Sequence, residues 1–329
     1  MHKEYILITG ALGFIGHHLS EFLAKKKYNL ILIDNFERGL KKEYINQRIN
    51  NLKKFKNVEI LNLDIRKINS TKKIKKRIKT IIHLAAINGT KNFYEKPDKV
   101  LDILLIGGYN ILQFAKKNKI KEIFFFSSSE VYQKPKKIPT NEDIECIVPN
   151  IWNPRYSYGG GKIAQELMIA NLYPKDFNKR IIIRPHNIYG PNMGNDHVIP
   201  EIIQKVFRLI KNKENILEII GSKKNTRSFM HIEDFLNAFY LIFKKKINNE
   251  IFNIGNNDEI SIEKLVKKIL QNFNNKLIIK EKIIKNFGQT NRRCPDITKI
   301  SKLGYKQKIS IDTGIKLMVQ NYFDLNDIY

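Results

Sequence analysis

The strongest constraint on the fold is a short apolar segment that runs directly into a glycine-rich turn and then an amphipathic stretch. Tyr5–Thr9 has the composition of a buried strand, and Gly10, Gly13 and Gly16 follow it in a GxxGxxG spacing. The first glycine permits a tight turn, the second lets the backbone approach a pyrophosphate, and the third allows close helix packing. The helix N-terminus then faces the phosphates. The segment therefore predicts a strand–turn–helix unit that binds a dinucleotide.

An acidic residue at the end of the next apolar segment supports the same prediction. Asp34 ends the strand expected at Leu30–Asp34, and its distance from Gly10 is close to the roughly 20 residues typical of a ribose-binding acid. Its carboxylate can accept hydrogen bonds from both ribose hydroxyls and would repel a 2′-phosphate, so NAD is favoured over NADP. The alternative is an aspartate that merely starts a turn.

The first half of the chain alternates short apolar runs with helix-period segments, which is the pattern of βαβ units and a parallel sheet. The expected strands are Tyr5–Thr9, Leu30–Asp34, Val58–Leu61, Thr80–Leu84, Glu122–Ser127 and Arg180–Arg184. Six parallel strands predict an α/β, doubly wound sheet.

After Pro185 the sequence is richer in Asn, Gly and Pro, with helices expected near Pro200–Lys211 and Ile232–Lys246. We therefore expect a nucleotide-binding domain at 1–180, with 228–255 packing back on it. A smaller, interleaved substrate-binding region is expected at 181–227 and 256–329, where it would close over the carboxyl ends of the strands.

The formal net charge of +27 would suit nucleic acid, an anionic membrane or an anionic substrate. Lys, Asn and Ile are abundant together, however, so compositional bias explains most of it, and runs such as 72–79 are expected to be solvated helix faces. The two cysteines, Cys146 and Cys294, have no paired spacing, which indicates a reducing compartment. The early first strand leaves no room for a signal peptide, and no apolar run approaches about 18 residues. The expectation is a cytoplasmic protein that neither spans a membrane nor binds nucleic acid.

A tyrosine and a lysine share one face of an expected helix. Tyr158 and Lys162 are at positions i and i+4, and they follow the strand that ends in the serines 127–129. Three glycines separate them, which is unfavourable in a helix. The expected reason for these glycines is close approach of a cofactor or substrate.

At this point the sequence resembles the extended short-chain dehydrogenase/reductases that act on nucleotide-sugars, the epimerase/dehydratase family, which has a Rossmann fold. The resemblance extends along nearly the whole chain. Its motifs are TGALGFIG at 9–16, Asp34, DIR at 64–66, HLAA at 83–86, SSSEVY at 127–132, YxxxK at 158–162, RPHNIYGP at 184–191, TRSFMHIED at 226–234, FNIG at 252–255 and RRCPDI at 292–297.

The resemblance implies catalytic roles. Tyr158 would accept the proton of a sugar hydroxyl as a hydrogen passes to the nicotinamide, and Ser128 would hydrogen-bond that hydroxyl. A free tyrosine has a pKa of about 10, so nearby positive charge is required. Lys162 would supply part of that charge and hold the nicotinamide ribose.

The resemblance also implies the binding residues. The NAD-binding set is Gly10, Gly13, Phe14, Ile15, Gly16, Asp34, Asn35, Asp64, Ile65, Leu84, Ala85, Ala86, Tyr158 and Lys162. Ser129, Asn187, Arg227 and one of Arg292 and Arg293 would bind the nucleotide-diphosphate sugar, since guanidinium groups suit phosphate oxygens. A homodimer with a helical interface is also implied.

Some positions are interpreted as structural or depart from the family. His83 and His231 adjoin apolar segments and are expected to be packed, hydrogen-bonded residues. No spacing indicates a metal site. Gln133 stands where the family motif VYG has glycine, which should alter only a loop. Leu104 stands where asparagine is common, which removes a polar group near the cofactor.

Glu130 bears on the reaction. Family reactions begin with oxidation of a ring carbon, usually C4. An epimerase then returns the hydrogen to the opposite face, a dehydratase needs a base for C5 and an acid for the leaving hydroxyl, and a decarboxylase expels a C6 carboxylate. Family dehydratases and decarboxylases often carry glutamate at the position of Glu130. The sequence therefore favours a lyase, with a 4-epimerase as the alternative. A non-catalytic NAD-binding or RNA-binding module is a distant third, against which Tyr158, Lys162 and Ser128 argue.

Overall fold

The computed structural model describes residues 3–37, 42–70, 73–194, 197–273, 276–282 and 291–326. The chain divides into two compact units. Unit 1 comprises 1–133, 145–185 and 242–252, and unit 2 comprises 134–144, 186–241 and 253–329. Each unit is therefore built from separated stretches of sequence. The domain boundaries expected from the sequence stay a prediction.

Unit 1 is built on a parallel sheet. Its first six strands are β1 (Tyr5–Thr9), β2 (Leu30–Asp34), β3 (Val58–Asn62), β4 (Ile78–His83), β5 (Glu122–Phe126) and β6 (Lys179–Pro185). Every pairing among these six is parallel. A seventh strand, β11 (Glu250–Ile254), lies beside β6, so the order is β11-β6-β5-β4-β1-β2-β3. The doubly wound sheet expected from the sequence is confirmed, with one strand more than predicted.

The order of the strands reverses next to β1, because the chain moves outward through β2 and β3 and then returns to β4 on the other side of β1. In an open sheet of this kind, ligands bind beyond the carboxyl ends of the strands at this reversal. The topology thus places the glycine turn after β1 and the segment after β4 at the usual ligand-binding edge.

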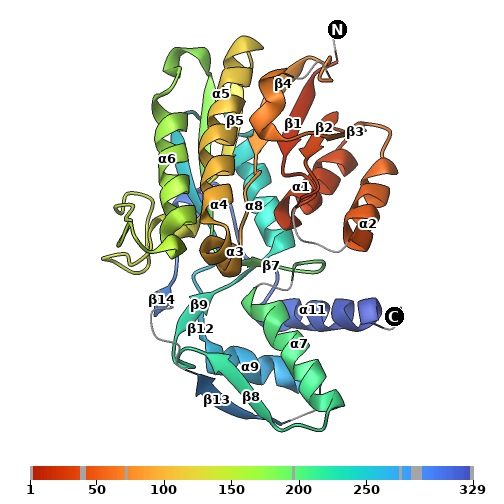
Figure 1. Ribbon diagram of the computed structural model, residues 1–329, viewed down its shortest axis with the longest axis vertical. Coiled ribbons are helices and arrows are strands. Elements are labelled where there is room, and N and C mark those ends of the chain that lie inside the picture. Colours follow the sequence, from red (N-terminus) through yellow and green to blue (C-terminus); the bar gives the residue numbers. More distant parts are fainter. Residues whose placement is uncertain are drawn as a thin grey trace. The chain divides into compact units, whose positions relative to one another are not determined.

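Helices cover the sheet on both faces because its strands are apolar on both sides. The helices and helical turns of unit 1 are α1 (Phe14–Lys25), α2 (Lys42–Lys53), η1 (Ile65–Ser70), α3 (Thr90–Glu95), α4 (Pro97–Asp102), η2 (Ile103–Gly107), α5 (Gly108–Lys117), η3 (Ser129–Val131), η4 (Pro154–Tyr156), α6 (Ser157–Asn171) and η5 (Pro174–Asp176). Figure 1 shows α4, α5 and α6 grouped together, while α1 and α2 form a second group beside β1, β2 and β3.

One hydrophobic core of unit 1 lies under α5 and α6. Alternate strand residues such as Ile81 and Phe125 pack there with Ile111 and Leu112 of α5 and Ile169 of α6, and all five are at least 97% buried. This alternation follows from the two-residue side-chain period of a strand. The core holds rigid the strand ends from which the candidate site residues project.

Unit 2 is built from short strands and amphipathic helices. Its elements are β7 (Ile188–Tyr189), α7 (Val198–Lys211), β8 (Ile216–Ile220), β9 (Thr226–Ser228), β10 (Met230–His231), β12 (Glu259–Ser261), α9 (Ile262–Gln271), β13 (Ile278–Lys282), β14 (Arg292–Arg293), α10 (Thr298–Lys302) and α11 (Ile311–Asn326). Helix α8 (Ile232–Lys244) begins in unit 2, and its last residues belong to unit 1. A separate core joins α7, α9 and α11, with Val206, Ile269 and Ile315 fully buried.

One expectation about the lysine-rich segment 72–79 is wrong. Residues 73–77 are not helical, and Ile78 already begins β4. Ile78 is buried because it pairs with Tyr5 of β1, so sheet pairing overrides the local charge pattern.

Candidate active site

The glycine turn leaves no space for side chains. Gly10 has φ +67°, and a Cβ there would lie 2.8 Å from the backbone of Ala85. A Cβ on Gly16 would lie 2.1 Å from the carbonyl oxygen of Gly10. Helix α1 starts immediately afterwards at Phe14. The turn therefore has the bare backbone and the helix N-terminus that a dinucleotide pyrophosphate requires.

Asp34 is fixed at the end of β2, next to this turn. Its Oδ2 accepts a hydrogen bond from the Leu12 backbone N–H at 3.0 Å, and its Oδ1 accepts one from Phe36 at 2.9 Å. A carboxylate oxygen has a second acceptor site, so both oxygens can still bind ribose hydroxyls. Asp34 thus starts a turn, as the alternative interpretation of the sequence held, and also lies in a position suited to ribose.

Asp64 is a charged acceptor beyond β3. Hydrogen bonds from the Arg66 guanidinium lower the pKa of Asp64 to about 2, and the two side chains form an ion pair at 2.5 Å. The Asn35 side chain also donates to Asp64, at 3.4 Å. Arg66 in turn pairs with Asp102. Asn35 and Asp64 therefore lie together, as a shared role in binding adenosine would require.

Lys162 is buried at the carboxyl end of strand β5. Its Nζ donates to the Phe126 carbonyl at the end of β5, at 2.7 Å, and lies 5.9 Å from the centre of the Tyr158 ring. Burial lowers the pKa of Lys162 to about 7. The structure therefore brings the predicted lysine and tyrosine together at the carboxyl end of β5.

The Tyr158 ring is held by apolar packing. It stacks on Phe93 of α3, with ring centres 4.9 Å apart and an angle of 12° between the planes. Val100 and Leu104 complete this cluster. Leu104, which replaces the polar residue common in the family, therefore packs with the cluster that orients Tyr158.

Gly159 and Gly161 of α6 are packed too closely to carry a side chain. A Cβ on Gly159 would lie 2.5 Å from the Gln133 side chain and 2.9 Å from the Glu130 carbonyl, and one on Gly161 would lie 2.6 Å from Leu104. Packing therefore explains Gly159 and Gly161, and the close approach of a cofactor or substrate stays a prediction. The two glycines let α6 approach the segment that carries Glu130.

Ser128 and Glu130 lie in one tight turn after β5. Ser128 caps η3 and accepts the Glu130 backbone N–H at 3.2 Å, and Ser129 between them is buried. The Glu130 carboxylate forms an ion pair with Arg155 at 2.9 Å. Sequence reasoning missed a role for Arg155, although its position three residues before Tyr158 placed it near the site.

The candidate residues of unit 2 lie around β9 and β14. Arg293 is in register with Arg227 on the neighbouring parallel strand, so the two side chains share one face of the sheet. Arg292 points to the opposite face, where it pairs with Glu259 at 2.5 Å. The Asn187 side chain donates to the Ser228 carbonyl at the end of β9. The register thus favours Arg293 over Arg292 as the partner of Arg227.

The two histidines are structural, as expected. His83 is 1% exposed and lies 2.7 Å from the Thr9 hydroxyl. Burial, with a contribution from Lys162, lowers the pKa of His83 to about 3. His231 is equally buried and packs edge-on against Tyr189, and burial lowers the pKa of His231. Both are therefore neutral near pH 7.

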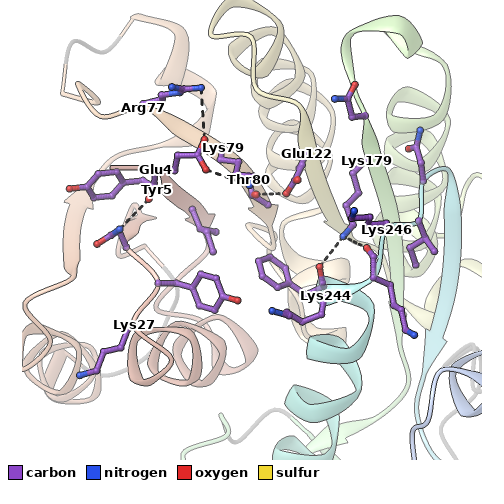
Figure 2. A pocket seen from close by; sticks show the side chains of 18 residues that line it. Glu4, Tyr5, Lys27, Arg77, Lys79, Thr80, Glu122, Lys179, Lys244 and Lys246 are labelled. Atoms are coloured by element: carbon purple, nitrogen blue, oxygen red, sulfur yellow. Dashed lines mark hydrogen bonds and ion pairs between the residues drawn. The ribbon is translucent and has the colours of Figure 1, made fainter. Parts of the chain in front are cut away.

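A hollow of about 1000 Å³ lies at the opposite, amino-terminal edge of the sheet in unit 1. Tyr5, Glu122 and Lys179, the first residues of β1, β5 and β6, contribute to it, and Thr80 donates to Glu122 there at 2.7 Å (Figure 2). The described lining includes none of the candidate cofactor or catalytic residues. The hollow is therefore separate from the chemistry inferred at the carboxyl edge.

Two absences hold for the residues that the structure describes. No cluster of three or more His, Cys, Asp or Glu residues could hold a metal ion. None of the helices is long and apolar enough to cross a membrane.

The bare glycine turn, Asp34, and Tyr158 with Lys162 together define a short-chain dehydrogenase/reductase of the extended kind. The family model described as GDP-mannose 4,6 dehydratase matches residues 7–318. The chain belongs to this family of nucleotide-sugar epimerases and dehydratases.

Relatives within the family catalyse different reactions. A UDP-N-acetyl-alpha-D-glucosaminuronate decarboxylase of Bacillus cytotoxicus is 31% identical over 331 residues, covering 99% of each chain. A dTDP-D-glucose 4,6-dehydratase of Dictyostelium discoideum is 33% identical over 81% of this chain and 62% of its own. A crystal structure of a UDP-glucuronic acid 4-epimerase from Bacillus cereus has a TM-score of 0.84 and 25% identity, and covers 98% of this chain and 99% of its own.

Proposed function

We propose that this chain is an NAD-dependent nucleotide-sugar lyase of carbohydrate biosynthesis. It oxidises the sugar at C4 and then releases a C6 carboxylate as CO₂. The carrying observation is the Glu130–Arg155 ion pair in the turn that also holds Ser128. The full-length similarity to a nucleotide-sugar decarboxylase supports the proposal.

Residues of the chain perform the proton chemistry. Ser128 hydrogen-bonds the C4 hydroxyl, and Tyr158 accepts its proton. Lys162 lies close enough to influence Tyr158 electrostatically, and its pKa of about 7 lets it change charge near neutral pH. NAD would be held at the glycine turn, where it would supply the two-electron oxidation at C4 and the matching reduction that ends the cycle. The cradle of Gly10 and Gly16 and the acid Asp34 fit this cofactor, and Asp34 disfavours NADP.

The C4 ketone makes carboxylate loss possible. The C5–C6 bond breaks, its electron pair moves to C5 and is delocalised onto the C4 oxygen, and CO₂ leaves. A proton from solvent, relayed by a water molecule that hydrogen-bonds Glu130, then adds at C5, and reduction at C4 gives the shortened sugar.

Dehydration instead needs an acid for the leaving hydroxyl. An ion-paired carboxylate such as Glu130 accepts protons and hydrogen bonds rather than donating them, which favours decarboxylation.

The nucleotide end of the substrate is assigned to unit 2. Arg227 and Arg293 present two guanidinium groups on one face of β9 and β14, and such forks suit a diphosphate. The Asn187 side chain is held at the end of β9 because it donates a hydrogen bond to the Ser228 carbonyl. Ser129, in the turn with Ser128, would contact the sugar.

Two further features of the protein are proposed. The protein forms a homodimer, since Ile106, Tyr109 and Leu167 expose large apolar side chains on η2, α5 and α6. It acts in the cytoplasm, a location that its two free cysteines suit.

The test is product analysis by mass spectrometry with UDP-glucuronate, UDP-N-acetylglucosaminuronate and their neutral counterparts. The wild-type protein should release CO₂ from a uronate. Glu130→Gln should still form NADH and a 4-keto sugar, while the later step slows by about 10²–10⁴-fold, the usual contribution of a positioned acid or base. Tyr158→Phe, the control, should prevent both steps and leave NAD binding intact.

A second candidate is a uronate 4-epimerase, favoured by the likeness to the Bacillus cereus structure. It would yield an epimer without mass loss, and Glu130→Gln would then alter the rate modestly without accumulating ketone. If the Glu130→Gln variant formed the same product as wild type at nearly the same rate, the lyase assignment would be refuted.

A further inference from the structure

Arg155 is a buried cation among the proposed catalytic groups. The residue is 8% exposed, and its Nη2 lies 2.9 Å from Oε2 of Glu130. Its Cζ lies 5.3 Å from the centre of the Phe93 ring, the ring on which Tyr158 stacks. The guanidinium therefore contacts Phe93, on which Tyr158 stacks, and Glu130, whose backbone N–H donates to Ser128.

The local backbone fixes Arg155 in this place. The Asn153 side chain accepts the Arg155 backbone N–H at 2.9 Å and caps the turn η4. Pro154 begins that turn, and α6 follows it directly at Ser157. Proline restricts φ and the cap removes a free donor, so the guanidinium is presented from a rigid base.

One nitrogen of Arg155 is left without a partner. Its Nη1 is buried and makes no hydrogen bond within the described part of the chain. Leaving a buried donor unsatisfied costs about 1–3 kcal/mol, and more when the group is charged. Such a group in a native site calls for an explanation, and an acceptor on a ligand is one.

A second buried arginine of unit 1 shows the contrast. Arg184 is 3% exposed, and its Nε and Nη2 donate to Glu166 at 2.9 and 2.6 Å. Its Nη1 donates to the Tyr132 hydroxyl at 2.7 Å. Arg184 thus has every guanidinium nitrogen bonded, whereas the buried Nη1 of Arg155 has no hydrogen-bond partner in the described part of the chain.

We propose that Arg155 determines the substrate class by binding the carboxylate of a hexuronic-acid nucleotide through Nη1. Its charge also offsets that of Glu130, because two unscreened carboxylates in one buried site repel each other. A neutral sugar would offer Nη1 only an uncharged hydroxyl oxygen, which is a weaker acceptor than a carboxylate. The inference rests on the proposed function, because it requires that a nucleotide-sugar occupies this site. It holds for a uronate decarboxylase and for a uronate epimerase.

The experiment measures the Kd of UDP-glucuronate and of neutral UDP-glucose by calorimetry on the NAD-loaded protein. Arg155→Gln should weaken UDP-glucuronate binding by about 10- to 100-fold, the equivalent of a charge-assisted hydrogen bond. UDP-glucose binding should change by less than about 3-fold, a difference small on the same scale. Arg155→Lys should recover part of the loss, because it restores the charge. Arg77→Gln, an exposed site with the same change of charge, is the matched control and should change neither ligand.

A double variant separates substrate contact from mere positioning of Glu130. If Arg155 binds the carboxylate, adding Arg155→Gln to Glu130→Gln should still weaken UDP-glucuronate binding at least about 10-fold, the loss of one such bond. Equal affinities of the double variant and Glu130→Gln would overturn the inference, as would equal weakening of both ligands by Arg155→Gln. Should Arg155→Gln not fold, as judged by circular dichroism, the comparison of Arg155→Lys with wild type decides.

Failure of the proposed function is detected separately. A wild-type protein that converts neutral sugars and releases no CO₂ from either uronate contradicts the decarboxylase assignment. A protein that does release CO₂ but whose affinities are unaffected by Arg155→Gln contradicts the inference about Arg155 alone.

Discussion

Lys162 of helix α6 is 1% exposed, and within the described part of the chain its side chain forms no ion pair with a carboxylate. Burial lowers the pKa of Lys162 from 10.5 to about 7. Between these values the unfolded chain binds more protons than the folded one, so stability rises with pH. Below about pH 7 both states carry the proton, and the cost of burying the charge is fully present.

We therefore expect a difference between wild type and Lys162→Met in denaturant unfolding. From about pH 7 toward pH 10.5, the unfolding free energy of wild type should rise relative to the variant, by at most about 1.4 kcal/mol per pH unit. Titratable groups far from Lys162 behave alike in both proteins, so their contributions cancel in the difference. Parallel pH profiles would mean that Lys162 keeps an ordinary pKa.

At the scale of elements, the first turn of α6 depends on close packing against the turn that carries Glu130. Gly159→Ala would place a Cβ 2.9 Å from the Glu130 carbonyl oxygen, a backbone atom that cannot yield cheaply. We expect a loss of about 1–3 kcal/mol in unfolding free energy, as for other overpacked sites. Turnover should fall as well, because Glu130 and its partner Arg155 must shift.

Gly160→Ala provides the matched control for this prediction. Its Cβ would meet only a side-chain atom of Val148 at 3.3 Å, and alanine gains about 1 kcal/mol of helix propensity over glycine. This variant should therefore be as stable as wild type or slightly more so. Thermal unfolding and initial rates of both variants measure the effect, and similar behaviour of the two would contradict the packing explanation.

For the whole molecule, the apolar residues exposed on α5 and α6 predict self-association. These two helices contact each other, and Leu167 on α6 is 60% exposed. Exposed apolar patches of this kind mark interfaces. We expect a dimeric mass in light scattering at micromolar concentration and a shift toward monomer in Leu167→Glu. Leu317→Glu, at an exposed leucine of α11 in unit 2, should leave the mass unchanged, and a monomeric wild type would rule out the dimer.

The amino-acid sequence by itself determined the features that depend on local pattern. Apolar runs predicted β1 and β2 to the residue, since both are central, buried strands with clear ends. The glycine spacing identified the turn after β1, because few other residues tolerate its φ and its close contacts. The i, i+4 spacing placed Tyr158 and Lys162 on one helix face, because helical geometry fixes that relation.

Tertiary structure decided the features that join distant segments. Strand β11 has an ordinary local pattern, and only its pairing beside β6 puts it in the sheet. The register of β14 on β9 puts Arg293, and not Arg292, on the same face as Arg227, since a shift of one residue reverses the face to which a side chain points. Arg155 gained its significance from an ion pair with Glu130 that no local periodicity encodes. Such pairings depend on how the whole chain closes on itself, and local sequence does not specify that closure.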